Sequence, residues 1–346
     1  IKHSKSKVKR ENSLPVKINV SSIKVKLKGR FAVKFIGAVV ILILNFSGEA
    51  WAKQLQFNKV TTDDFVEFNY QWLDQAQQTQ SLSFTIDKVM IFDKFRNFKS
   101  YSADHAKKYV DQKIRQSLIK SPLPEVKVNF LGYADNLQIE LQGKTQTAID
   151  QAYSSIAQLE KNFMLEHLEQ NYYTQFISFD NNLAIKPDHV RFAQASVIDF
   201  TKLKDLILNN FPDQNVREVA NYVLGFVQSI PYSTLESRVT STGAGFNPPL
   251  QTLWQNQGDC DSKVTLTTAI FRALMPRMKM MLVFIDNHAL LAMNIKPEEN
   301  ELTITVDGDD YILAEPTGPA MMKLGEISND SEFAIRNGRY YAEPFI

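Results

Sequence analysis

The stretch that decides the fold is Leu253-Trp-Gln-Asn-Gln-Gly-Asp-Cys-Asp-Ser-Lys-Val264, which continues into an apolar helical pattern up to Leu274. Gly258 and Asp259 are turn and helix-cap residues, so they predict that Cys260 lies at or near the start of a helix. Free backbone N–H groups and the helix dipole favour a thiolate at that position. Cys260 is the single cysteine of the 346 residues, which excludes an intramolecular disulfide and makes a reactive thiol worth testing.

A base and an acid follow downstream of Cys260. His288 lies in the strand-like apolar run 283–294, where an imidazole is costly unless its nitrogens have partners. The segments 302–306 and 311–315 predict a hairpin whose second strand ends in Glu315. A nucleophile at a helix start, a base on one strand and an acid on a neighbouring strand form an activated-nucleophile arrangement. The alternative acids lie in the hairpin turn, which makes them weaker candidates than Glu315: Asp307, Asp309 and Asp310.

Several motifs occur in one order along the chain. They are the helix and tyrosine from Val223 to Tyr232, Pro-Pro-Leu-x-x-Leu-Trp at 248–254, Gly-Asp-Cys-Asp-Ser-Lys at 258–263, His-Ala at 288–289 and Glu-Pro-Thr at 315–317. Over roughly residues 190–325 this order resembles the transglutaminase-like superfamily of papain-like cysteine enzymes. Members of that superfamily usually have Asp-Pro-Thr at the last motif, so Glu315 departs from the pattern by one methylene group.

The resemblance implies a fold and a chemistry. The fold class is α+β, with a papain-like core in which the helix carrying Cys260 packs on an antiparallel sheet carrying His288 and Glu315. Cys260 would be the nucleophile, His288 the general base and acid, and Glu315 the group that orients the imidazole. The oxyanion site would use the backbone N–H of Cys260 with the side chain of Trp254 or Gln257, although Trp254 is equally compatible with core packing. The reaction would be acyl transfer from a peptide or glutamine amide to the thiolate.

Water is the default acceptor of such an acyl group, so we expect a hydrolase, that is a cysteine protease or amidase, acting on a protein or peptide substrate. Two other functions stay open. The chain could keep the fold as a non-catalytic binding or scaffold protein, or it could be a transglutaminase that crosslinks amines. The scattered residues His105, His167 and His189 lack ligand spacing, so we expect no metal, and no motif indicates a cofactor.

The first 52 residues predict a basic leader and signal peptide. Residues 1–34 hold 11 Lys and Arg and one acid, and the apolar run 35–46 and the small-residue site Ala50-Trp-Ala52 follow. The apolar run is shorter than the about 20 residues of a membrane span, so we expect cleavage after Ala52, no stable membrane span afterwards and a periplasmic location in the cell envelope. Residues 53–346 then carry 28 bases and 36 acids, and the negative balance argues against nucleic acid as a partner.

The rest of the chain divides at a turn-rich stretch near residue 187. Alternating apolar residues at 82–86, 126–130 and 137–141 predict strands, and helical spacing predicts helices from Ser102 and over about 145–168. We therefore expect an N-terminal α+β domain of unknown role at 53–187 and the transglutaminase-like domain at 188–346.

Overall fold

The computed structural model describes residues 16–19, 53–132, 137–213, 215–236 and 245–346. Its contacts divide the chain into two compact units, Ile1–Lys26 with Tyr101–Gln175, and Leu27–Ser100 with Phe176–Ile346. The signal peptide and cleavage site predicted within 1–52 lie outside the described residues, apart from Val16–Asn19. Within the described ranges, no helix combines the length and apolar character needed to cross a membrane. The fold is mixed α+β with antiparallel sheets.

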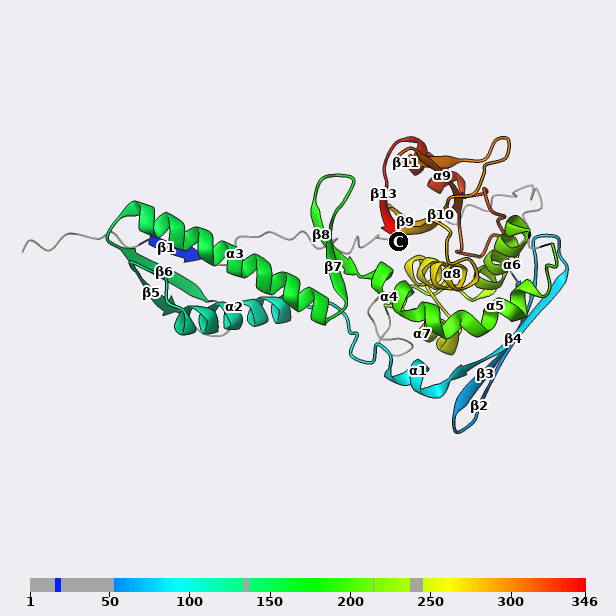
Figure 1. Cartoon of the computed structure of the whole chain (residues 1–346), viewed down its shortest axis with the longest axis horizontal. Helices are drawn as coiled ribbons and strands as arrows, with labels where there is room; N and C mark the ends of the chain where they lie inside the picture. The colour runs from blue at the N-terminus through cyan, green and yellow to red at the C-terminus, as the bar shows by residue number, and fades with distance from the viewer. Residues whose placement is uncertain (1–15, 20–52, 133–136, 214, 237–244) are drawn as a thin grey trace, which may run out of the picture. The chain divides into compact units, whose positions relative to one another are not determined.

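The first unit is a sheet and two helices (Figure 1). Its strands have the antiparallel order β1 (Val16–Asn19), β6 (Gln138–Gly143) and β5 (Val126–Leu131). Ser102 caps α2 (Ala103–Lys120) and Thr145 caps α3 (Gln146–Gln170), each by accepting a backbone N–H of the first turn. These elements confirm the predicted strands at 126–130 and 137–141 and both predicted helices. The buried apolar faces of the helices and of β6 form one core, which includes Val110, Ile114, Ile139, Leu141, Ala148 and Ala152.

The second unit contains a five-stranded antiparallel sheet. Its order is β11 (Thr303–Val306), β12 (Asp309–Ala314), β10 (His288–Met293), β9 (Met280–Ile285) and β13 (Tyr341–Phe345). Side chains alternate between two cores, so Leu291 packs with the residues of α8 (Cys260–Leu274) and Leu290 with those of α9 (Asn329–Arg336). Each face of this sheet is therefore covered by a helix.

Helix α8 is enclosed by further helices of the same unit (Figure 1). They are α4 (His189–Ser196), the 3₁₀ turn Val197–Phe200, α5 (Thr201–Leu208), α6 (Val216–Ser229) and α7 (Pro249–Gln255). The two-stranded sheet of β7 (Tyr173–Ile177) and β8 (Leu183–Pro187) precedes them in the sequence. Because α8 is buried almost all round, the position of Cys260 at its start is fixed from several sides.

A second sheet of this unit corrects the predicted domain boundary. Strands β2 (Lys53–Thr61), β3 (Phe65–Leu73) and β4 (Thr79–Asp87) are followed by α1 (Lys88–Asp93). The inward-facing rings of Tyr70 and Trp72 lie 4.9 and 5.5 Å from the ring of Phe226 in α6. These aromatic contacts make residues 53–100 part of the second unit, because the buried face of β3 has α6 as its partner. A domain at 53–187 is therefore not what the contacts show.

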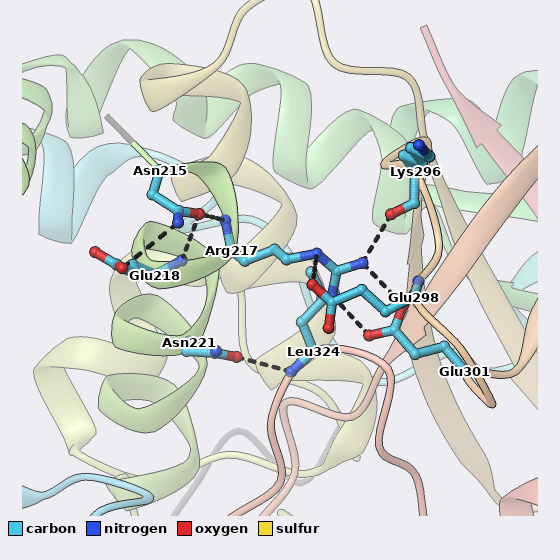
Figure 2. Close-up of polar contacts among 8 residues, drawn as sticks. All are labelled: Asn215, Arg217, Glu218, Asn221, Lys296, Glu298, Glu301 and Leu324. Atoms are coloured by element: carbon cyan, nitrogen blue, oxygen red, sulfur yellow. Dashed lines mark hydrogen bonds and ion pairs between the residues drawn. The ribbon is translucent and has the colours of Figure 1, made fainter. Parts of the chain in front are cut away.

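The N-terminus of α6 is clamped to two loops (Figure 2). The guanidinium of Arg217 donates to both carboxylate oxygens of Glu301, at 2.6 and 2.8 Å, and to the carbonyl oxygen of Lys296 at 2.7 Å, and it pairs with Glu298 at 3.1 Å. One turn further, the side-chain oxygen of Asn221 accepts the backbone N–H of Leu324 at 2.8 Å. The loops after β10 and β12 are thus attached to the start of α6, whose other end leads to the candidate site.

Candidate active site

The nucleophile candidate is where the sequence places it, at the first residue of α8. Asp259 caps this helix, since its side chain accepts the backbone N–H of Ser262 at 2.9 Å. Cys260 is 8% exposed, so its sulfur is shielded from bulk water while still lining a cavity. The predicted cap and helix start are both confirmed.

His288 reaches the sulfur from the neighbouring sheet. Its Nδ1 lies 2.8 Å from the Sγ of Cys260. The apolar run 283–294 is not one strand, because Asp286 and Asn287 form a turn between β9 and β10, with Asn287 at a φ of 57°. Asn tolerates this left-handed conformation better than most residues, and the turn makes His288 the first residue of β10.

Glu315 completes a line of three side chains. It directly follows β12, and its Oε1 lies 3.0 Å from Nε2 of His288. Its Oε2 accepts the backbone N–H of Ser328 at 2.9 Å and the hydroxyl of Ser331 at 3.1 Å, at the start of α9. Both carboxylate oxygens are therefore occupied, and the longer side chain of Glu spans the distance to the imidazole.

The three rival acids have other surroundings. Asp309 pairs with Lys279 at 2.6 Å, and Asp310 accepts the hydroxyl of Thr305 at 2.6 Å. Asp307 lies in the hairpin turn with a φ of 51°. The geometry therefore brings Glu315 to the imidazole and places these aspartates in and beside the turn.

The electrostatics favour a charged imidazole between the thiol and the carboxylate. Burial lowers the pKa of His288, but hydrogen bonds to Cys260 and Glu315 outweigh burial and raise it to about 10. Burial raises the pKa of Glu315, but the hydrogen bonds from His288, Ser328 and Ser331 bring it below its ordinary value. An imidazolium 2.8 Å from the sulfur stabilises a thiolate, so the site can hold a thiolate–imidazolium pair.

Tyr232 is a site residue to which the sequence assigned no role. It lines the same cavity as Cys260, and burial, the charges of Cys260 and Asp259 and a hydrogen bond to Cys260 raise its pKa to about 12. The backbone of Gly258 holds its neighbours, since it accepts the N–H of Ser233 at 3.1 Å and donates to the oxygen of Pro231 at 3.2 Å. Ile-Pro-Tyr after an amphipathic helix is visible in the sequence, but this long-range bridge is not.

Trp254 and Gln257 contact residues other than Cys260. The ring of Trp254 packs edge-on against Phe92 at 4.8 Å and lies under the ammonium of Lys59 at 3.6 Å. The side chain of Gln257 donates to Gln255 at 3.2 Å. Neither belongs to the described residues that line the Cys260 cavity. Tyr232, by contrast, lines that cavity.

Three adjacent cavities surround the line of three side chains. The cavity at Cys260 has a volume of about 360 Å³ and shares Tyr232 with a cavity of about 400 Å³. It also shares His288 and Ile285 with a cavity of about 370 Å³ that reaches Glu315. The cavity at the sulfur is therefore continued by two neighbouring cavities.

Neither a metal-binding cluster nor a similarity to known proteins indicates the function. In the part of the chain that the structure describes, no group of three or more His, Cys, Asp or Glu side chains is arranged to hold a metal ion. Comparisons with models of protein families, with curated proteins and with solved structures find no match to this chain. Function is therefore inferred from the chemistry of the site itself.

Proposed function

We propose that this chain is a cysteine enzyme of the transglutaminase-like superfamily that hydrolyses a peptide or amide bond. The observation that carries the proposal is the line of Cys260, His288 and Glu315, with atom separations of 2.8 and 3.0 Å. A helix bearing the thiol against an antiparallel sheet bearing the base is the arrangement expected of a papain-like core. Such a line activates a thiol and has no need of a metal.

In the first half-reaction the thiolate of Cys260 attacks the substrate carbonyl carbon. The carbonyl oxygen becomes an oxyanion, which the backbone N–H of Cys260 and the hydroxyl of Tyr232 stabilise by hydrogen bonding. The N–H at Nδ1 of His288 then protonates the leaving amine as the carbon–nitrogen bond breaks. A thioester and a free amine result.

In the second half-reaction His288 is neutral and acts as base. Its Nδ1 takes a proton from water, the hydroxide attacks the thioester, and the thiolate leaves with a carboxylic acid as product. Glu315 keeps the N–H at Nε2 directed toward itself throughout, which fixes the ring orientation and stabilises the imidazolium.

The cavities support an extended polypeptide as the substrate. One neighbouring cavity shares Tyr232 with the Cys260 cavity, and the other shares His288 with it. A peptide bond at the sulfur would therefore have adjacent space for the residues that flank it. A protein or peptide of the cell envelope fits the predicted export of the chain, for which the basic, apolar and small-residue segments of 1–52 are the support.

The contacts of Cys260 favour an enzyme over a binding protein on the same fold. A scaffold has no reason to keep a thiol within hydrogen-bond reach of a histidine that is itself held by a buried carboxylate. An amine-crosslinking enzyme would use the same first half-reaction and differ in its acceptor.

The test is the labelling rate of the mature protein with an iodoacetamide probe at neutral pH. Because Cys260 is the single cysteine, every label reports on the site. We expect His288→Ala to label at least about tenfold more slowly than wild type. His105 is an exposed histidine of α2, so His105→Ala should label like wild type. Equal rates in wild type and His288→Ala would refute the paired nucleophile. Release of peptides from envelope proteins would identify hydrolysis, whereas incorporation of a labelled amine would identify crosslinking.

A further inference from the structure

Lys263 is a buried cation that the mechanism above does not use. It lies one turn after Cys260 in α8 and is 0% exposed. Its ammonium donates to the carbonyl oxygens of Ile230, at 2.5 Å, and of Gln228, at 3.4 Å. Lysine is rarely buried to this extent, because removing an ammonium from water is costly. The hydrogen bonds to these two carbonyls offset part of that cost.

The carbonyls belong to the end of α6. Gln228 lies in its last turn and Ile230 is its C-terminal cap, where carbonyl oxygens lack partners within the helix and carry the negative end of the dipole. Tyr232 follows two residues later. The backbone of Gly258 holds the residues on either side of Tyr232, so the segment Ile230–Ser233 is attached both just before Cys260 and one turn after it.

The charge of Lys263 also acts on Cys260, since residues three apart in a helix lie on the same face. Burial lowers the pKa of Lys263 to about 7, while the negative charges of Cys260 and Asp259 act to raise it. Stabilisation between two groups is reciprocal, so an ammonium favoured by the thiolate also favours the thiolate. The described residues that line the cavity with the sulfur add further polar and charged groups, among them His288 from β10, Tyr232 and Glu236 from the segment after α6, Asp259 and Asp261 at the start of α8, and Lys186 from β8.

We propose that Lys263 is a positioning residue of this site, which holds the segment carrying Tyr232 against the start of α8 and stabilises the thiolate of Cys260. The inference rests on the proposed thiol chemistry. The lysine of Gly-Asp-Cys-Asp-Ser-Lys then supports the nucleophile as well as the core of the fold.

The experiment measures the rate of Cys260 alkylation against pH in Lys263→Met, which keeps the length and removes the charge. We expect the loss of charge to slow alkylation at pH 6.5 and to shift the midpoint of the pH profile of the rate to higher pH. The control is Thr268→Val, a buried, nearly isosteric change further along α8 that removes one hydrogen bond to Val264. It should change stability and leave the midpoint in place. An unchanged midpoint in folded Lys263→Met would overturn the inference.

A second measurement avoids any substitution at Lys263. Nitrogen NMR follows the ammonium of Lys263 in the wild-type chain and in Cys260→Ala, and we expect its midpoint near 7 to fall when the thiolate is removed. The same midpoint in both proteins would also overturn the inference. Failure of the proposed function itself would show separately, as equal labelling of wild type and His288→Ala.

Discussion

Replacing Glu315 by Gln tests the core of the site with the smallest change of shape. The carboxylate supplies one oxygen to His288 and the other to Ser328 and Ser331. Gln has a single acceptor oxygen, so its NH₂ group must face either the N–H of the imidazolium or the two donors at the start of α9. One set of donors is therefore left without an acceptor, and the negative charge is lost.

The size of the effect follows from the separation. An opposite charge within about 4–6 Å shifts a pKa by about 1–3 units, and Glu315 lies 3.0 Å from the imidazole. We therefore expect the pKa of His288 to fall from about 10 by that amount in Glu315→Gln. Each unit corresponds to about 1.4 kcal/mol and a factor of about ten in the proton-transfer equilibrium between the thiol and the imidazole, so alkylation of Cys260 at neutral pH should slow.

Proton NMR of the His288 ring measures the titration directly, with its signal assigned by its loss in His288→Ala. Asp310→Asn is the matched control, because Asp310 is a rival acid that bonds to Thr305 and should leave the ring unaffected. If His288 titrated at the same pH in wild type and Glu315→Gln, Glu315 would not be the partner of the imidazolium.

Three other predictions concern oxyanion stabilisation, the pH dependence of stability and the clamp on α6. Tyr232→Phe should slow acylation by a peptide ester about tenfold, while melting temperature changes little because the side chain is 51% exposed. The pKa of His288 is raised above its unfolded value of about 6.5, so its contribution to stability should be complete below that pH and disappear as pH rises through about 10. Urea unfolding midpoints of wild type should show this trend, and those of His288→Ala should lack it. Arg217→Ala should cost about 1–3 kcal/mol of unfolding free energy by loss of its bonds to Glu301, with the alkylation midpoint of Cys260 unchanged.

Local signals in the sequence predict the helix start at Cys260 and the hairpin before Glu315. Asp259 is a strong cap residue, and the Asp307–Gly308 pair is a strong turn signal, so both structures depend on neighbouring residues alone. The turn at Asp286 and Asn287 was missed because apolar residues flank it on both sides and make the run look like one strand.

Interactions between residues distant in the sequence could not be predicted from local patterns. The alternating aromatic residues of β3 predict a buried face but do not identify α6 as its partner. The sequence therefore groups residues 53–100 with the domain that follows them rather than with α6. Tyr232 gains its place beside Cys260 only through the backbone of Gly258. The burial of Lys263 and its bond to Ile230 become visible only when α6 is placed against α8.

The contacts of Glu315 have an evolutionary consequence. Its two oxygens serve different needs, since one orients His288 and the other receives the donors at the start of α9. A descendant that lost the thiol, and with it any turnover, would still need an acceptor for α9 at this position. Selection for folding alone would then preserve the acid, so among related chains the state of position 260, rather than that of position 315, would separate active from inactive members.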